Sequence, residues 1–275
     1  MVALLQQSPS HSEAPRPVTT DNALATFYRV YPEALPVMRA DRTALGTLPA
    51  AALQHCEAIC TASAFGWYVF PAHDLSIWFD GTDIFIEIAD EWVRLASLQL
   101  PGSEQWWNPY VGDELQNSPP PFVTALGMPG YMQVWSGSLI ESRPGWSTLV
   151  RPLANVTRNA QISCFEGLVE TDQFAPSPLF TNLRVCVTNR RIVLPADEPL
   201  FQVQVLPRET YSARSLSSAV CVDMFDDDCD HANMLEAKLQ GYGNTIRTAN
   251  MAESESPSGR YARAVRKRAR QGSAD

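Results

Sequence analysis

Short runs of alternating apolar and polar residues, interrupted by proline or glycine, recur through the centre of the chain. Residues 201–205 read Phe-Gln-Val-Gln-Val, so that every second side chain would point to the same side of a strand. The chain also holds 21 Pro against 14 Gly, and proline shortens both helices and strands. We expect strands at residues 27–31, 66–70, 75–79, 84–88, 131–136, 147–152, 165–171, 183–187, 191–194 and 200–206. This pattern predicts a mostly β fold, a β-sandwich or partly open barrel of about nine to ten strands.

Two segments have helical rather than strand periodicity. In residues 48–62, Pro49 suits a first helical turn, and Leu53, Cys56 and Cys60 share one face. A second helix is expected within residues 220–250, beginning at an acidic cluster and ending near Gly241. The fold therefore gains one helix in its N-terminal half and one C-terminal helix.

One hairpin is marked by its turn residues. Asp80-Gly81 lies between the apolar runs 75–79 and 84–88, which is a strong signal for a two-residue turn. A longer loop that extends through Thr82 and Asp83 is the alternative.

Composition and charge divide the chain into three parts. Residues 1–22 are rich in Ser, Pro, Gln and Thr and are expected to form a disordered leader. Residues 23–250 hold the expected single β-rich domain, and residues 251–275 a disordered basic tail. The net charge is −9, yet six of the 21 Lys and Arg and only one of the 30 Asp and Glu lie from Arg260 onward. The rest of the chain is therefore strongly acidic, which makes nucleic acid and membrane unlikely partners; the tail alone has the charge to attract them.

The cysteines and the N-terminus suggest a compartment. Six Cys are present, and the first residues contain no basic segment and no apolar core of the length that a signal peptide needs. We therefore expect free thiols and a cytoplasmic protein.

No metal site and no cofactor are assigned from the sequence. The four His (His11, His55, His73 and His231) lack the spacing that places two ligands on one face of a strand. The acidic cluster Asp226–Asp228, with Asp223 and Asp230, either caps a helix N-terminus or binds a cation through its carboxylates.

Three carboxylates lie along one expected strand. In residues 165–172, Glu166, Glu170 and Asp172 would share a face, about 6–7 Å apart for neighbours two residues apart. Such a row could transfer protons or hold a cation, so these three are the candidate catalytic residues. The alternative is a solvated outer face whose acids pair with Arg184, Arg190 or Arg191.

Tryptophans supply a second set of candidates. Trp67 begins an apolar run, and Trp106 and Trp107 lie in a long polar and proline-rich connection, residues 101–121. A tryptophan in a loop either lines a binding cleft or covers the core.

Several of these strings together resemble an uncharacterised bacterial family, a domain of unknown function of roughly 250 residues. The resemblance rests on Tyr31-Pro32, Gly66-Trp67, Trp78 with Asp80-Gly81, Leu149-x-Arg-Pro with Asn155, Glu-Gly-Leu-Val-Glu-Thr-Asp at 166–172, and Phe-Thr-Asn at 180–182. It implies a bacterial origin and a compact β-rich fold, and no activity.

Three functions remain open after these observations. The preferred one is a small-molecule or peptide binding protein whose cleft uses Trp67, Trp106, Trp107, Asn155, Thr181 and Asn182. The second is a β-barrel enzyme that uses the strand carboxylates as acid, base or metal ligand. The third is a protein–protein interaction module.

Overall fold

The computed structural model describes residues 23–49, 53, 55–156, 161–222, 235, 237 and 260–272. In this part of the chain, fifteen strands form three antiparallel sheets, and none of the three closes into a barrel. The prediction of a mostly β fold with few helices is confirmed.

The first sheet has six strands in the order β11-β13-β9-β8-β7, with β1 paired to β9. Its strands are β1 (Ala25–Arg29), β7 (Ser97–Leu98), β8 (Val123–Ala125), β9 (Tyr131–Ser142), β11 (Ile162–Cys164) and β13 (Ser177–Val185).

The second sheet has five strands in the order β12-β10-β15-β3-β2. They are β2 (Met38–Arg39), β3 (Trp67–Val69), β10 (Trp146–Arg151), β12 (Gly167–Val169) and β15 (Phe201–Pro207). The short strands β11 and β12, only two residues apart in the chain, are edge strands of the first and second sheets.

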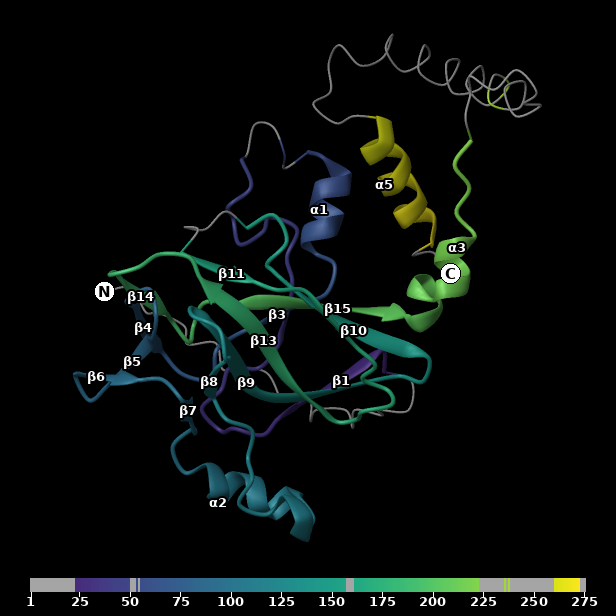
Figure 1. Cartoon of the computed structure of the whole chain (residues 1–275). Helices are drawn as coiled ribbons and strands as arrows, with labels where there is room; N and C mark the ends of the chain where they lie inside the picture. Colours follow the sequence, from purple (N-terminus) through teal and green to yellow (C-terminus); the bar gives the residue numbers. More distant parts are fainter. Residues whose placement is uncertain are drawn as a thin grey trace, which may run out of the picture.

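The third sheet has four strands in the order β14-β4-β5-β6 and lies at one end of the molecule (Figure 1). They are β4 (Leu75–Phe79), β5 (Ile84–Ile88), β6 (Glu91–Arg94) and β14 (Arg191–Leu194). The predicted β4–β5 hairpin is present with the longer loop, because β4 ends at Phe79 and β5 begins at Ile84, directly opposite each other. Within the loop, the Asp80 amide donates to the Asp83 carbonyl at 3.2 Å.

The helices are short and lie outside the sheets. They are α1 (Glu57–Ser63), α2 (Ser103–Trp107), α3 (Ala213–Ser217) and α5 (Arg260–Gly272), with single 3-10 turns η2 (Asn108–Tyr110), η3 (Asp113–Leu115) and η4 (Arg208–Tyr211). Among the described helices, none has the length and apolar character required to cross a membrane.

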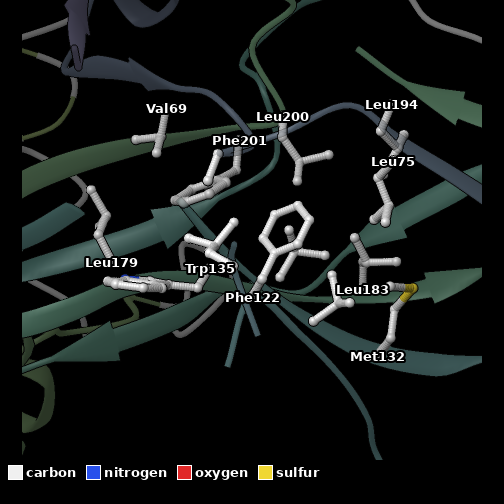
Figure 2. Close-up of a cluster of buried hydrophobic side chains, with 14 of the residues drawn as sticks. Val69, Leu75, Phe122, Met132, Trp135, Leu179, Leu183, Leu194, Leu200 and Phe201 are labelled. Carbon is white, nitrogen blue, oxygen red and sulfur yellow. The ribbon is translucent and has the colours of Figure 1, made fainter. Parts of the chain in front are cut away.

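All three sheets contribute to one contiguous hydrophobic core (Figure 2). Met132 and Leu183 come from the first sheet, Phe201 from the second, and Leu75 and Leu194 from the third. Burying each such side chain stabilises the fold by about 1.5–3 kcal/mol relative to leaving it exposed.

One close approach between main-chain segments requires glycine. Gly66, between α1 and β3, has a φ of +114°, and a Cβ built there would lie 1.9 Å from the Val203 carbonyl oxygen of β15. Only a residue without a side chain allows α1 to lead into β3 at this distance.

Some segments differ from the sequence expectations. The expected helix over residues 48–62 is helical only from Glu57 in the described residues, and the long connection 101–121 contains α2, η2 and η3. Residues 260–272, within the tail expected to be disordered, form α5, whose Arg266 lies 3.4 Å from Glu57 of α1. The expected leader, the acidic cluster, His231 and most of the expected helix 220–250 lie outside the described residues.

Candidate functional site

A slot of about 180 Å³ opens between the first and second sheets at the edge where β12 lies beside β13. One wall comes from β10 and β12, and the other from β9 and β13. Its lining includes three residues singled out in the sequence: Glu166, Thr181 and Asn182. We call this cavity the inter-sheet slot.

The walls of the inter-sheet slot present mainly apolar surface to a ligand, because the hydroxyl groups among them are already hydrogen-bonded. Ile140, Val150 and Leu179 are buried aliphatic side chains in its lining. Its hydroxyl groups bond to one another or to nearby polar atoms: Thr148 Oγ1 lies 2.8 Å from Thr171 Oγ1, which in turn donates to the Ser142 hydroxyl at 2.7 Å. Because those hydroxyls are already paired, the slot offers a guest mainly van der Waals contact.

Phe165, Glu166 and Asn182 are the more polar or exposed part of the lining. The Phe165 amide donates to the Asn182 carbonyl at 2.9 Å, which continues the pairing of β11 with β13 past the end of the strand. The Phe165 ring stacks on Tyr131, with 5.7 Å between ring centroids, and the Asn182 side chain accepts a hydrogen bond from Gln133 Nε2 at 3.0 Å.

The three candidate carboxylates each lie within ion-pair distance of an arginine. Glu166 lies 3.5 Å from Arg151 Nε, and Glu170 lies 3.5 Å from Arg208 Nε. Arg208 also donates to Asp172. The sequence interpretation that named Arg184, Arg190 or Arg191 as partners is corrected: β12 pairs with β10, which brings Arg151 alongside it, whereas those three arginines lie in or beside β13 and β14.

Asp172 is the best buried of the three, with a side chain that is 3% exposed. Burial by itself raises the pKa of this carboxyl. The hydrogen bond from the Gly145 amide at 2.8 Å and the charge of Arg208 outweigh burial, so the pKa of Asp172 lies below its usual range. Asp172 is therefore ionised at neutral pH and cannot donate a proton as a general acid.

The structure places the other candidate residues away from the inter-sheet slot. Trp67 packs against Phe27 with ring centroids 5.4 Å apart, and the Arg39 guanidinium lies 5.6 Å from its ring. Asn155, with a φ of +60°, donates through Nδ2 to the Ser63 hydroxyl at 3.1 Å and so ties its loop to α1.

Trp106 and Trp107 belong to α2. The Trp106 ring packs between Tyr31 and Trp135, at centroid distances of 5.2 and 5.9 Å. Trp107 is buried and donates its indole N–H to the Leu115 carbonyl at 2.9 Å. Both rings pack against the hydrophobic core. This arrangement matches the second role considered for these tryptophans, covering the core, and not the lining of a binding cleft.

A larger cavity of about 500 Å³ lies beside β11 and β14, and its walls mix apolar residues with Gln161, Ser163 and Glu198. It contains none of the candidate residues. The inter-sheet slot is the more apolar of the two and gathers three of them, so we take it as the candidate site.

Sequence reasoning missed the part of the slot that comes from β9 and β10. Ile140, Thr148 and Val150 look like ordinary core positions of alternating strands. Only the packing of β10 against β13 turns them into the walls of a cavity, and no local pattern indicates that packing.

Comparisons with known proteins give a distant structural likeness. No family model and no curated protein matches the chain. The dUTPase from phage phi11 of S. aureus is similar at a TM-score of 0.33 and 8% identity, over 74% of this chain and 98% of the phage protein. The dUTPase of Staphylococcus bacteriophage 80alpha with dUpNHpp is similar at a TM-score of 0.34 and 8% identity, over 76% of this chain and 93% of the phage protein.

Proposed function

We propose that this protein is a binding protein whose inter-sheet slot takes an apolar group the size of one ring or one branched side chain. The observation that supports the proposal is the slot itself: an apolar cavity that opens at the edge of two packed sheets and whose threonine hydroxyls are already paired.

The volume sets the size of the guest. A dry protein cavity of about 150 Å³ lined by Leu, Ile and Phe binds benzene. At about 180 Å³, the inter-sheet slot matches a single aromatic ring or an aliphatic group of about four to six carbons. A whole cofactor would need about 300 Å³ or more.

The carboxylates in and beside the slot are better suited to recognition than to general-acid catalysis. Glu166, in the lining, is paired with Arg151, and Asp172 is held ionised by the Gly145 amide and Arg208. Glu166, in the lining, can orient a ligand by accepting hydrogen bonds. Asp172, which follows the lining residue Thr171, has no proton to transfer as a general acid.

The apolar group belongs either to a small molecule or to a peptide side chain. β12 is the last strand of its sheet, so an extended peptide has an open edge to pair with while one of its side chains enters the slot. Titration with benzene, indole and the capped amino acid N-acetyl-phenylalanine amide separates the two: tighter binding of the capped amino acid supports the peptide.

The experiment is a series of thermal melts with these ligands. A ligand present at about ten times its Kd stabilises the folded state by about 1.4 kcal/mol, which raises the Tm of a domain of this size by about 3–6 °C. The contradicting result is a Tm that stays constant with all three ligands up to their solubility limits.

A pair of variants tests whether the ligand-dependent rise in Tm comes from binding in the inter-sheet slot. Val169→Phe places a ring into the lining of the slot, whereas Val220→Phe makes the same change at a position that is largely exposed. We expect the first variant to lose the ligand-dependent rise in Tm and the second to keep it. Equal responses in both variants would place binding elsewhere on the protein.

A further inference from the structure

The third sheet exposes aromatic side chains on the face that it turns away from the core. Leu75, Ile77 and Phe79 of β4 are buried in the core, so the alternate residues Ser76 and Trp78 lie on the opposite face. The same alternation in β5 buries Ile84 and Ile86 and places Phe85 and Glu87 outside.

The strand register brings these outer residues together. Trp78 is directly opposite Phe85 on β5, and Glu87 is opposite Trp92 on β6. The Trp78 and Trp92 rings lie with centroids 6.0 Å apart at an interplanar angle of 55°, and Trp92 is 40% exposed. We call Trp78, Phe85 and Trp92 the aromatic platform.

Each arginine beside the platform is paired with an acid. Arg191, opposite Trp78, lies 2.5 Å from Glu87 and donates to the Ser76 hydroxyl at 3.2 Å. Arg94, opposite Phe85, lies 2.7 Å from Asp83. Asp80 also interacts with Arg94, so the border of the platform offers hydrogen-bonding groups and no unpaired positive charge on either arginine.

We propose that the aromatic platform binds a neutral saccharide. One face of a pyranose ring is a set of C–H groups that packs on a flat indole, while its hydroxyls both donate and accept hydrogen bonds. The platform supplies both requirements, since the exposed Trp92 ring and the half-buried Trp78 and Phe85 rings are bordered by carboxylate acceptors and guanidinium donors that are already in place. This site is separate from the inter-sheet slot, which opens between the other two sheets.

The charge distribution argues against a polyanion on this face. Nucleic acids also stack their bases on aromatic side chains, yet they require free basic groups for the phosphates. Both arginines of the platform are paired with acids, and the chain carries a net charge of −9. A neutral ligand meets no such repulsion.

The test follows the tryptophan indole N–H signals by NMR while the full-length protein is titrated with cellohexaose and with maltohexaose. We expect the Trp78 and Trp92 signals to shift with at least one hexasaccharide. Trp92→Ala is expected to weaken binding about tenfold or more, as loss of one stacking ring does in other aromatic sites. Tyr110→Ala, which removes a largely exposed ring from η2, serves as the matched control and is expected to bind as the wild type does.

Three results would overturn the proposal. The first is the absence of any shift at Trp78 and Trp92 with both hexasaccharides. The second is a shift that follows protein concentration instead, which would mean that a second copy covers the platform. The third is a shift with a thymidine oligonucleotide at physiological salt and none with the saccharides.

Discussion

Asp172 and Glu170 share one arginine but differ in burial, which allows a sharp test of the electrostatics beside the slot. Both acids contact Arg208; the Asp172 side chain is 3% exposed and that of Glu170 is 44% exposed. We consider the two isosteric changes Asp172→Asn and Glu170→Gln, each of which removes a negative charge and keeps the shape of the side chain.

The two variants are expected to lose different amounts of folding free energy, several-fold more for Asp172→Asn than for Glu170→Gln. Breaking a fully buried ion pair costs about 3–5 kcal/mol, and an exposed pair contributes about 0.2–1 kcal/mol. Arg208 is 30% exposed and stays partly solvated, and the asparagine still accepts the Gly145 hydrogen bond. We therefore expect Asp172→Asn to lower the free energy of unfolding by about 2 kcal/mol, and Glu170→Gln by about 0.3 kcal/mol.

The contribution of Asp172 to the free energy of unfolding decreases as the pH falls. Because the pKa of Asp172 is lower in the folded than in the unfolded protein, its contribution to stability is complete above the unfolded value of about 4 and is lost as the pH falls through the folded value. Urea denaturation of wild type and Asp172→Asn at pH 7, and at steps below about pH 5, measures the difference. Equal costs for the two variants at pH 7, or a gap that does not narrow as the pH falls, would refute the reasoning.

Two further substitutions test packing that the fold depends on. Gly66→Ala is expected to cost about 3 kcal/mol or more, because its Cβ would overlap the Val203 carbonyl; Gly46→Ala, also at a positive φ but with open space around it, should cost about 1–2 kcal/mol. Gln202→Leu is expected to cost about 2–3 kcal/mol, since the buried amide of Gln202 donates to two backbone carbonyls and accepts from one backbone N–H. Thermal or urea denaturation measures both, and costs below about 0.5 kcal/mol would contradict the contacts described.

Local patterns in the sequence predicted local structure well. The β4–β5 hairpin is present where alternation and turn residues placed it, because pairing of neighbouring runs depends on a few adjacent residues. The alternating run 201–205 is likewise a strand, β15, although it lies in the middle of its sheet with both Phe201 and Gln202 buried. Its alternating pattern reflects hydrogen bonding of Gln202 inside the fold rather than exposure to water.

The candidate site was predictable only in part. The sequence predicted Glu166 as a candidate catalytic residue and Thr181 and Asn182 as candidate binding residues, and all three line the inter-sheet slot. Trp106 and Trp107 were predicted as candidate binding residues because they lie in a polar connection, yet both rings, on α2, pack against the core. The walls from β9 and β10 depend on which strands of two different sheets face each other, which is a property of the tertiary fold and not of any segment.

The most direct test of the binding proposal locates the guest inside the protein. Isotope-filtered NMR on a complex with benzene or indole reports which methyl groups lie against the bound ring. Contacts to Ile140, Val150 and Leu179 are predicted, because these side chains line the inter-sheet slot. Contacts confined to other methyl groups, or none under saturating ligand, would contradict the account.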